Sequence, residues 1–247
     1  MCKSASFVLT KTECYFSTET DSHEGIGEAH GVPMMLAGRN AVVFVEARPT
    51  GVLTDWEKWE IEVDTPEDDL PTWFADDRET HLNRARATIP HYVKAKFKQR
   101  KGGGLEVIGG FTVHNWGKEA LAEVVKISGD LTVYGRATLK VLTKCGNLTV
   151  YRRATLKADA LAECGDLTLR NWATLDAAAL TQCGELYVGI EATLKTAALT
   201  QCGDLNVSDG ATLDAAALTK CRHLTVWGSL HAPALKTVNG KPYRQEG

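Results

Sequence analysis

The sequence predicts a mainly β protein in which a small α+β domain precedes a right-handed β-solenoid of about seven coils, each 17–20 residues long. Three observations lead to this fold class. A strand-like phrase recurs at a nearly fixed period, apolar and polar residues alternate within each repeat, and polar residues recur at the same repeat positions.

The recurring phrase is an apolar residue, a polar residue and a second apolar residue. It begins at Phe111, Leu131, Leu148, Leu167, Leu186, Leu205 and Leu224, so the steps are 20, 17, 19, 19, 19 and 19 residues. A period in this range is typical of solenoids, whose coils bury their apolar sides against one another.

Within one repeat, Leu205 and Val207 alternate with polar residues, as do Leu213 and Ala215. This period of two indicates two strands, each with one buried face. A helix over residues 211–220 is the alternative, as in longer leucine-rich repeats. Pro233 occupies the position of Ala216 in the last repeat, and proline disfavours a helix interior. Short extended segments with tight corners are therefore predicted.

Outward positions of the second strand indicate how the coils stack. Charged residues recur there, and in-register stacking at about 4.8 Å would make the last four of them a row of alternating sign: Lys140, Lys157, Asp176, Lys195 and Asp214. A threonine row is expected two residues earlier: Thr138, Thr155, Thr174, Thr193 and Thr212. Both rows predict parallel, in-register coils.

Five cysteines share one repeat position, and glycine follows the first four: Cys145, Cys164, Cys183, Cys202 and Cys221. A column of thiols gives each sulfur neighbours only above and below, without the convergent tetrahedral ligands that zinc prefers. We therefore interpret them as small apolar core residues. No C-x-x-C or H-x-x-x-H spacing occurs, and no Gly-Lys-Ser/Thr follows Gly102–Gly104, so neither a metal site nor a cofactor is expected.

The segments Gly-Asp-Leu-Thr-Val, Gly-Ala-Thr-Leu-Asp-Ala and Gly-Ser-Leu-His-Ala-Pro-Ala-Leu-Lys-Thr-Val resemble short leucine-rich or receptor-L-type repeats of phage-encoded and bacterial proteins. The resemblance covers about residues 105–240. It implies a binding scaffold without naming a ligand.

The first 97 residues predict the small α+β domain. Strands are expected at 4–9 and 13–17 as a hairpin, and at 41–48 and 59–63; helices are expected at 21–31, after a capping box, and at 75–87. Residues 92–99 alternate apolar residues with lysines, which predicts an extended basic segment. Residues 98–104 are the expected basic, glycine-containing linker, 105–240 the solenoid and 241–247 a tail, with residues 239–247 as a cap.

Four short segments of this region resemble the opening module of uncharacterised phage proteins: Met1-Cys-Lys-Ser4, Asp21-Ser-His-Glu24, Trp56 and Trp59 with Val63-Asp64, and Leu70-Pro-Thr-Trp73. The match covers roughly residues 1–85. It bears on origin and implies no activity.

The net charge of −3 hides a split between an acidic stretch, 55–79, and a basic stretch, 84–101. The chain is therefore neither a uniformly basic nucleic-acid binder nor an acidic DNA mimic. No run of about 18 apolar residues predicts a membrane span. Free thiols fit a reducing compartment, so we expect a cytoplasmic protein, in the host cytosol if phage-encoded.

Cys2 is the one candidate nucleophile. Removal of Met1 would give a terminal cysteine with its own α-amine as base, and His23 could assist it in amidohydrolase or transferase chemistry. Glutamine amidotransferases and abasic-site-crosslinking proteins are similar in starting with Met-Cys, but they continue with glycine where this chain has Lys3.

Aromatic and arginine residues recur three and five residues after the start of each of the first four phrases: His114 and Trp116, Tyr134 and Arg136, Tyr151 and Arg153, Arg170 and Trp172. Stacking should place them along one edge as a binding strip, suited to protein hot spots or to nucleobases.

Together with Lys94, Lys96 and Lys98, this strip predicts a non-enzymatic binding protein that engages a host protein or nucleoprotein complex, with nucleic acid as a further partner. An anti-defence or host-modulating role follows from the phage resemblance alone. The alternatives are an enzyme that uses Cys2 and a self-assembling structural solenoid in which exposed ends pair into homo-oligomers.

Overall fold

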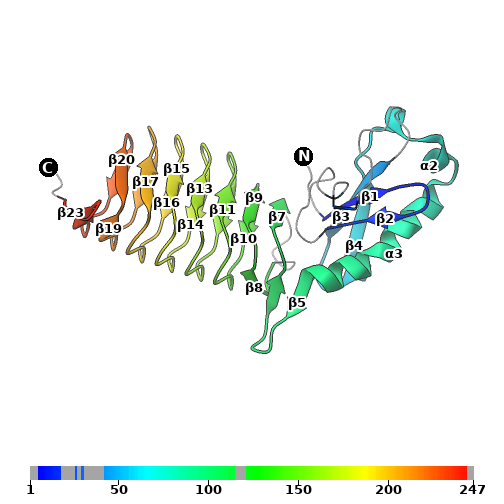
Figure 1. Cartoon of the computed structure of the whole chain (residues 1–247), viewed down its shortest axis with the longest axis horizontal. Coiled ribbons are helices and arrows are strands. Elements are labelled where there is room, and N and C mark those ends of the chain that lie inside the picture. Colours follow the sequence, from blue (N-terminus) through cyan, green and yellow to red (C-terminus); the bar gives the residue numbers. More distant parts are fainter. Residues whose placement is uncertain (1–4, 18–25, 27–28, 31–41, 115–120, 244–247) are drawn as a thin grey trace.

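The computed structural model describes residues 5–17, 26, 29–30, 42–114 and 121–243. It contains an N-terminal head of one sheet and one long helix, followed by a row of stacked coils (Figure 1). The predicted mainly β class and the C-terminal β-solenoid are confirmed. No helix within the described ranges is both long and apolar enough to cross a membrane.

The head is a four-stranded antiparallel sheet in the order β2-β1-β3-β4, and its strands are β1 (Ala5–Leu9), β2 (Cys14–Tyr15), β3 (Val43–Pro49) and β4 (Trp59–Val63). A short helical segment, η1 (Trp56–Lys58), precedes β4, and two others, η2 (Glu67–Asp69) and α2 (Thr72–Asp76), follow it. The predicted hairpin and both later strands are therefore confirmed. The predicted helix at 21–31 lies largely outside the described residues.

The long helix α3 (Arg78–Lys96) corrects the prediction of an extended segment at 92–99. Its buried residues follow a helical spacing: His81, Ala85, Ile89, Tyr92, Val93 and Lys96. The alternation of Val93, Ala95 and Phe97 was misleading because Ala95 is only half-buried and Lys96 points into the core. Pro90 lies inside α3 although proline is unfavourable in a helix interior. Packing of the helix on the sheet therefore outweighs the low helix propensity of this residue. Tyr92 anchors this packing against Phe7 and Phe16, with ring centroids 5.5 Å away in each case.

The expected linker at 98–104 is instead a tight hairpin between β5 (Phe97–Gln99) and β6 (Leu105–Val107). Gly103 and Gly104 take positive φ values of 89° and 76°, which glycine adopts without steric penalty. The ring of Phe97 lies 6.0 Å from that of Phe111 in the first coil. One hydrophobic core therefore continues from the head into the solenoid.

The solenoid is built from two parallel sheets in which each strand pairs with its equivalent one coil away. The first sheet contains β7 (Phe111–His114), β9 (Leu131–Tyr134), β11 (Leu148–Val150), β13 (Leu167–Leu169), β15 (Leu186–Val188), β17 (Asp204–Val207) and β20 (His223–Val226). The second contains β10 (Arg136–Thr138), β12 (Thr155–Lys157), β14 (Thr174–Asp176), β16 (Thr193–Lys195), β18 (Thr212–Asp214) and β21 (Ser229–His231). No helix replaces the second strand, so the extended interpretation is confirmed.

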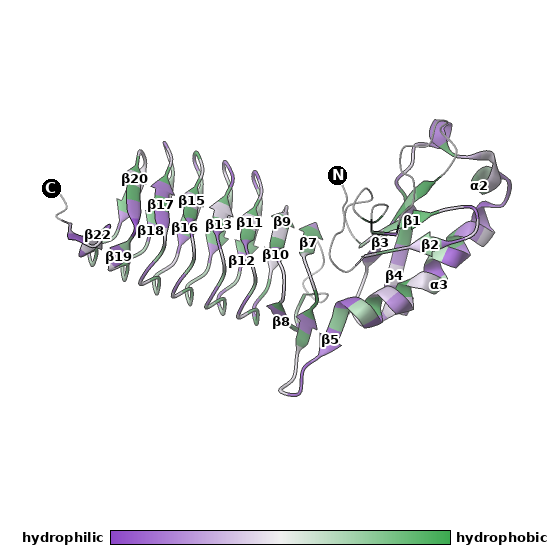
Figure 2. Cartoon of the chain, viewed as in Figure 1, coloured by the Kyte–Doolittle hydropathy of each residue, from purple (hydrophilic) through white to green (hydrophobic). Residues whose placement is uncertain are grey.

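A third ladder runs along the remaining side of the coils. Single bridges join Lys126, Lys144, Glu163, Gln182, Gln201 and Lys220 in succession. At one end the ladder meets β8 (Val124–Ile127), and at the other it continues through β19 (Lys220–Cys221) to β22 (Thr237–Val238) and β23 (Lys241–Pro242). Along the strands of the two large sheets, apolar and polar residues alternate (Figure 2). Their apolar side chains form columns of leucine, valine and alanine that fill the interior of the solenoid.

The pairing confirms the predicted charge row for its last four members, because Lys157, Asp176, Lys195 and Asp214 are successive Cα partners. Thr138, however, pairs with Lys157, and Arg136 pairs with Thr155. Thr138 and Lys140 therefore stand outside the rows in which they were expected. The reason is that the 17-residue coil is shortened at the corner before β10, which moves the second strand by two residues.

Candidate binding surface

The candidate site lies on the edge of the solenoid where strands of the first sheet end. His114, Tyr134, Tyr151 and Arg170 occupy the same position, directly after or at the end of β7, β9, β11 and β13. Parallel in-register pairing of these strands brings residues 17–20 apart in sequence into lateral contact.

These four side chains form one continuous stack. The His114 and Tyr134 ring centroids are 4.5 Å apart and nearly parallel, and those of Tyr134 and Tyr151 are 4.1 Å apart. The Arg170 guanidinium carbon lies 6.0 Å from the Tyr151 centroid, within cation–π range. Both faces of Tyr134 are therefore covered by protein neighbours.

A second contact lies at the adjoining corner. The guanidinium carbons of Arg152 and Arg153 lie 4.8 and 5.6 Å from the centroid of Trp172, whose side chain is exposed. The sequence pattern did not include Arg152, because it compares only the positions three and five residues after the start of each phrase and Arg152 lies four residues after Leu148. The adjacent basic pair Arg152-Arg153 was the available signal. We call His114, Tyr134, Tyr151, Arg152, Arg153, Arg170 and Trp172 the arginine–aromatic ridge.

The corner backbone holds the ridge in a conformation unusual for these residue types. Arg153 and Trp172 have positive φ values of 62° and 59°, as does Glu191 in the following coil (57°). The left-handed region costs a non-glycine residue about 1–2 kcal/mol. Hydrogen bonds between coils hold these corners, with N···O distances of 3.2 Å from Arg153 to Asn171 and 2.9 Å from Trp172 to Ile190. The corner backbone that carries Arg153 and Trp172 is thus held by the neighbouring coil.

Some of the predicted site residues are not part of this ridge. Arg136 is exposed at the start of β10 rather than at a corner, and Trp116 lies outside the described residues. Lys96 is fully buried, and its Nζ donates to the carbonyl oxygen of Gly110 at 2.5 Å. Lys94 and Lys98 are exposed, but α3 and β5 abut the start of β7, whereas the ridge begins at its end. Burial removes Lys96 from any binding surface, whereas a site that the ridge shares with Lys94 and Lys98 stays a prediction.

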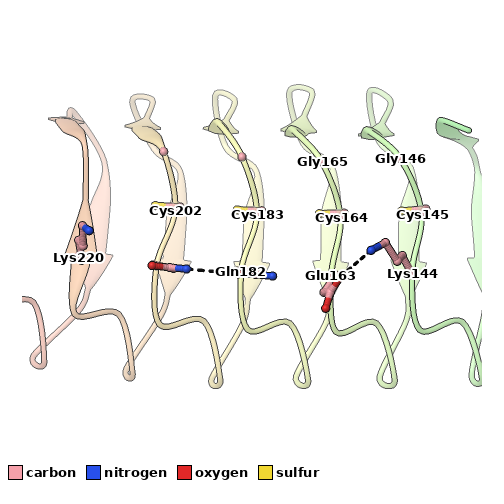
Figure 3. Close-up of a pocket in the computed structure, with 13 residues that line it drawn as sticks. Lys144, Cys145, Gly146, Glu163, Cys164, Gly165, Gln182, Cys183, Cys202 and Lys220 are labelled. Carbon is pink, nitrogen blue, oxygen red and sulfur yellow. Dashed lines mark hydrogen bonds and ion pairs between the residues drawn. The ribbon is translucent and has the colours of Figure 1, made fainter.

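The cysteine column lines a groove of about 640 Å³ along the third ladder (Figure 3). Four of its polar side chains are paired, Lys144 with Glu163 at 2.8 Å and Gln201 with Gln182 at 3.2 Å, and Lys220 also lines the groove. Burial raises the pKa of the thiols, to about 12 for Cys164 and Cys202. Neutral, desolvated thiols are poor nucleophiles and poor metal ligands. In the part of the chain that the structure describes, no cluster of three or more metal-ligating side chains occurs.

The glycines that follow cysteines of the column have a steric cause, which is clearest at Gly165 and Gly184. A Cβ on Gly165 would lie 2.4 Å from the Asn147 Oδ1 atom of the preceding coil, and a Cβ on Gly184 would lie 2.2 Å from Asp166 Oδ1. Those oxygens accept hydrogen bonds from the Asp166 and Glu185 backbone N–H groups at 2.8 Å. The contacts of Asn147 and Asp166 therefore explain why glycine stands at residues 165 and 184 of the following coils.

The candidate nucleophile Cys2 and its partner His23 lie outside the described residues. Comparison of the chain with protein-family models, curated proteins and solved structures finds no match. Both family resemblances therefore stay predictions, and the geometry of the ridge alone supports a function.

Proposed function

We propose that this chain is a non-enzymatic binding protein whose arginine–aromatic ridge engages an acidic surface on a partner protein. The observation on which this rests is the stack from His114 to Arg170 with Trp172 beside Arg152 and Arg153. Tyrosine, tryptophan and arginine dominate interface hot spots. Because backbone hydrogen bonds already fix the corners, little backbone entropy is lost when they bind.

The ring geometry favours a protein partner over a nucleobase. Single-stranded nucleic acid binds by stacking bases on exposed aromatic faces. The faces of Tyr134 are occupied by His114 and Tyr151 at 4.5 and 4.1 Å, so a base finds only ring edges there. Guanidinium groups beside these edges suit carboxylates, which they bind in bidentate fashion.

The resemblance of residues 1–85 to modules of phage proteins supports a proposal about the origin of the chain and where it acts. The chain would be phage-encoded and would act in the host cytosol on a host protein, alone or within a nucleoprotein complex. Its effect would be host modulation or anti-defence.

The proposal is tested by a triple variant, Arg152→Ala, Arg153→Ala and Arg170→Ala. The matched control is Lys140→Ala, Lys157→Ala and Lys195→Ala, which removes the same charge from exposed positions elsewhere. Partners captured from host lysate are identified, purified and titrated by calorimetry. We expect the arginine variant to weaken binding at least about 100-fold, since single hot-spot residues contribute about 2 kcal/mol or more, and the lysine control to bind like the wild type.

Equal binding by both variants would contradict the proposal. A second outcome would contradict the choice of partner class. If a single-stranded oligonucleotide competes for the ridge, and its affinity falls steeply with salt, nucleic acid is the ligand.

A further inference from the structure

The C-terminal end of the solenoid ends in two unpaired strand edges. β20 is the last strand of the first sheet and β21 the last of the second, and no further strand among residues 5–243 that the structure describes pairs with either. Val226 is 40% exposed, whereas its equivalent Val207 in the preceding coil is fully buried. Trp227 is 73% exposed. Apolar residues that form the core elsewhere are thus uncovered here.

Within the described part of the chain, a C-terminal hairpin protects one edge at this end, that of the third ladder. There β22 and β23 form a hairpin over β19, and β23 consists of Lys241 and Pro242. Lysine and proline are the residues with which natural proteins block unwanted strand addition. Thus the expected cap at 239–247 covers, in its described part, the third ladder and leaves β20 and β21 open.

The open edges are also free of formal charge. No lysine, arginine, aspartate or glutamate lies between His223 and His231, whereas the same stretch of the preceding coil contains Asp204, Asp209 and Asp214. A two-fold axis places equivalent parts of one surface face to face, so a charged edge would repel its own copy. A neutral edge meets this requirement.

We propose that this end, formed by β20, β21 and Trp227, is an interface for the same end of a second copy. The second copy offers two open edges at the same separation and an equivalent apolar patch, which a single extended peptide does not. The opposite end of the solenoid continues into the head (Figure 1), and the Phe97 ring of β5 contacts the Phe111 ring of β7 there. The head occupies the space that a head-to-tail neighbour would need, so the proposal predicts a closed tail-to-tail dimer.

Light scattering after gel filtration tests this proposal with two matched double variants. Thr225→Lys with Ser229→Lys places charges on β20 and β21, and Thr168→Lys with Thr174→Lys places the same charges in the same columns on β13 and β14, in the interior of the stack. We expect the wild type and the interior variant to be dimers, and the end variant to dissociate at least about tenfold more readily. Circular dichroism confirms that each variant is folded.

Three results would overturn the proposal. The first is a wild type that is monomeric at every concentration measured. The second is a dimer that both variants retain, because its interface would lie elsewhere. The third is a ladder of masses beyond the dimer, because the contact would then be head-to-tail. Dimerisation and partner binding through the ridge are separate measurements, so either can fail alone.

Discussion

At the scale of single residues, the solenoid depends on atoms that lie one coil apart. Asp166 shows this most clearly, because its Oδ1 accepts from the Glu185 N–H and also fills the space that a side chain at residue 184 would need. Sequence analysis found the glycines but not their cause, since the cause is a contact between residues 18 positions apart.

Gly184→Ala should therefore lower the free energy of unfolding by about 1–3 kcal/mol, because overpacking and loss of a hydrogen bond act together. Urea titration measures this. In an Asp166→Ala background the added methyl group meets no carboxylate, so the second substitution should cost less than it does alone. Strict additivity in this double-mutant cycle would contradict the described contact. Gly102→Ala, where nothing lies within 4 Å, is the neutral control.

At the scale of elements, the sequence predicts the repeating parts well and the unique parts less well. Seven copies of one phrase reinforce one another, so the strands and the stacking of Tyr134 on Tyr151 could be predicted. Residues 92–99 occur once, and their apolar alternation fits both periods over so short a stretch. Only the sheet that Tyr92 packs against decides for the helix. Arg136 was misplaced because a two-residue deletion cannot be located within a coil from its length alone.

The cysteine column predicts a pH dependence for its element. Burial raises the pKa of Cys164 and Cys202 from 9.0 to about 12. Between these values the unfolded chain has lost thiol protons that the folded chain keeps, so the free energy of unfolding falls as pH rises from about 9 to about 12. A Cys164→Ala, Cys202→Ala variant should show a shallower fall in urea titrations across this range. The same slope in both proteins would show that the thiols are not desolvated.

At the scale of the whole molecule, the hydrophobic core of the head continues into the first coils of the solenoid. Phe97 lies between Trp59 and Tyr92 of the head and Phe111 of the first coil, with ring centroids 6.0–6.3 Å apart. The strand β7, which ends at His114 of the ridge, therefore packs directly on the head.

Phe97→Ala should remove about 3–5 kcal/mol of stability and should lower hydrogen-exchange protection in α3 and in β7 together, while β17 keeps its protection. Phe74→Ala, at a buried position in α2, is the control that should affect the head alone. If Phe97→Ala leaves β7 as protected as before, the head and the solenoid are independent units.

All of these proposals depend on coils that lie directly over one another, and ring contacts across the ridge test this most directly. With selectively labelled tyrosines, nuclear Overhauser spectra should show strong contacts between the rings of Tyr134 and Tyr151, whose centroids are 4.1 Å apart. The histidine ring of His114 should contact Tyr134 in the same spectra. Absence of the Tyr134–Tyr151 contact in the folded protein would contradict the stacking and, with it, the ridge.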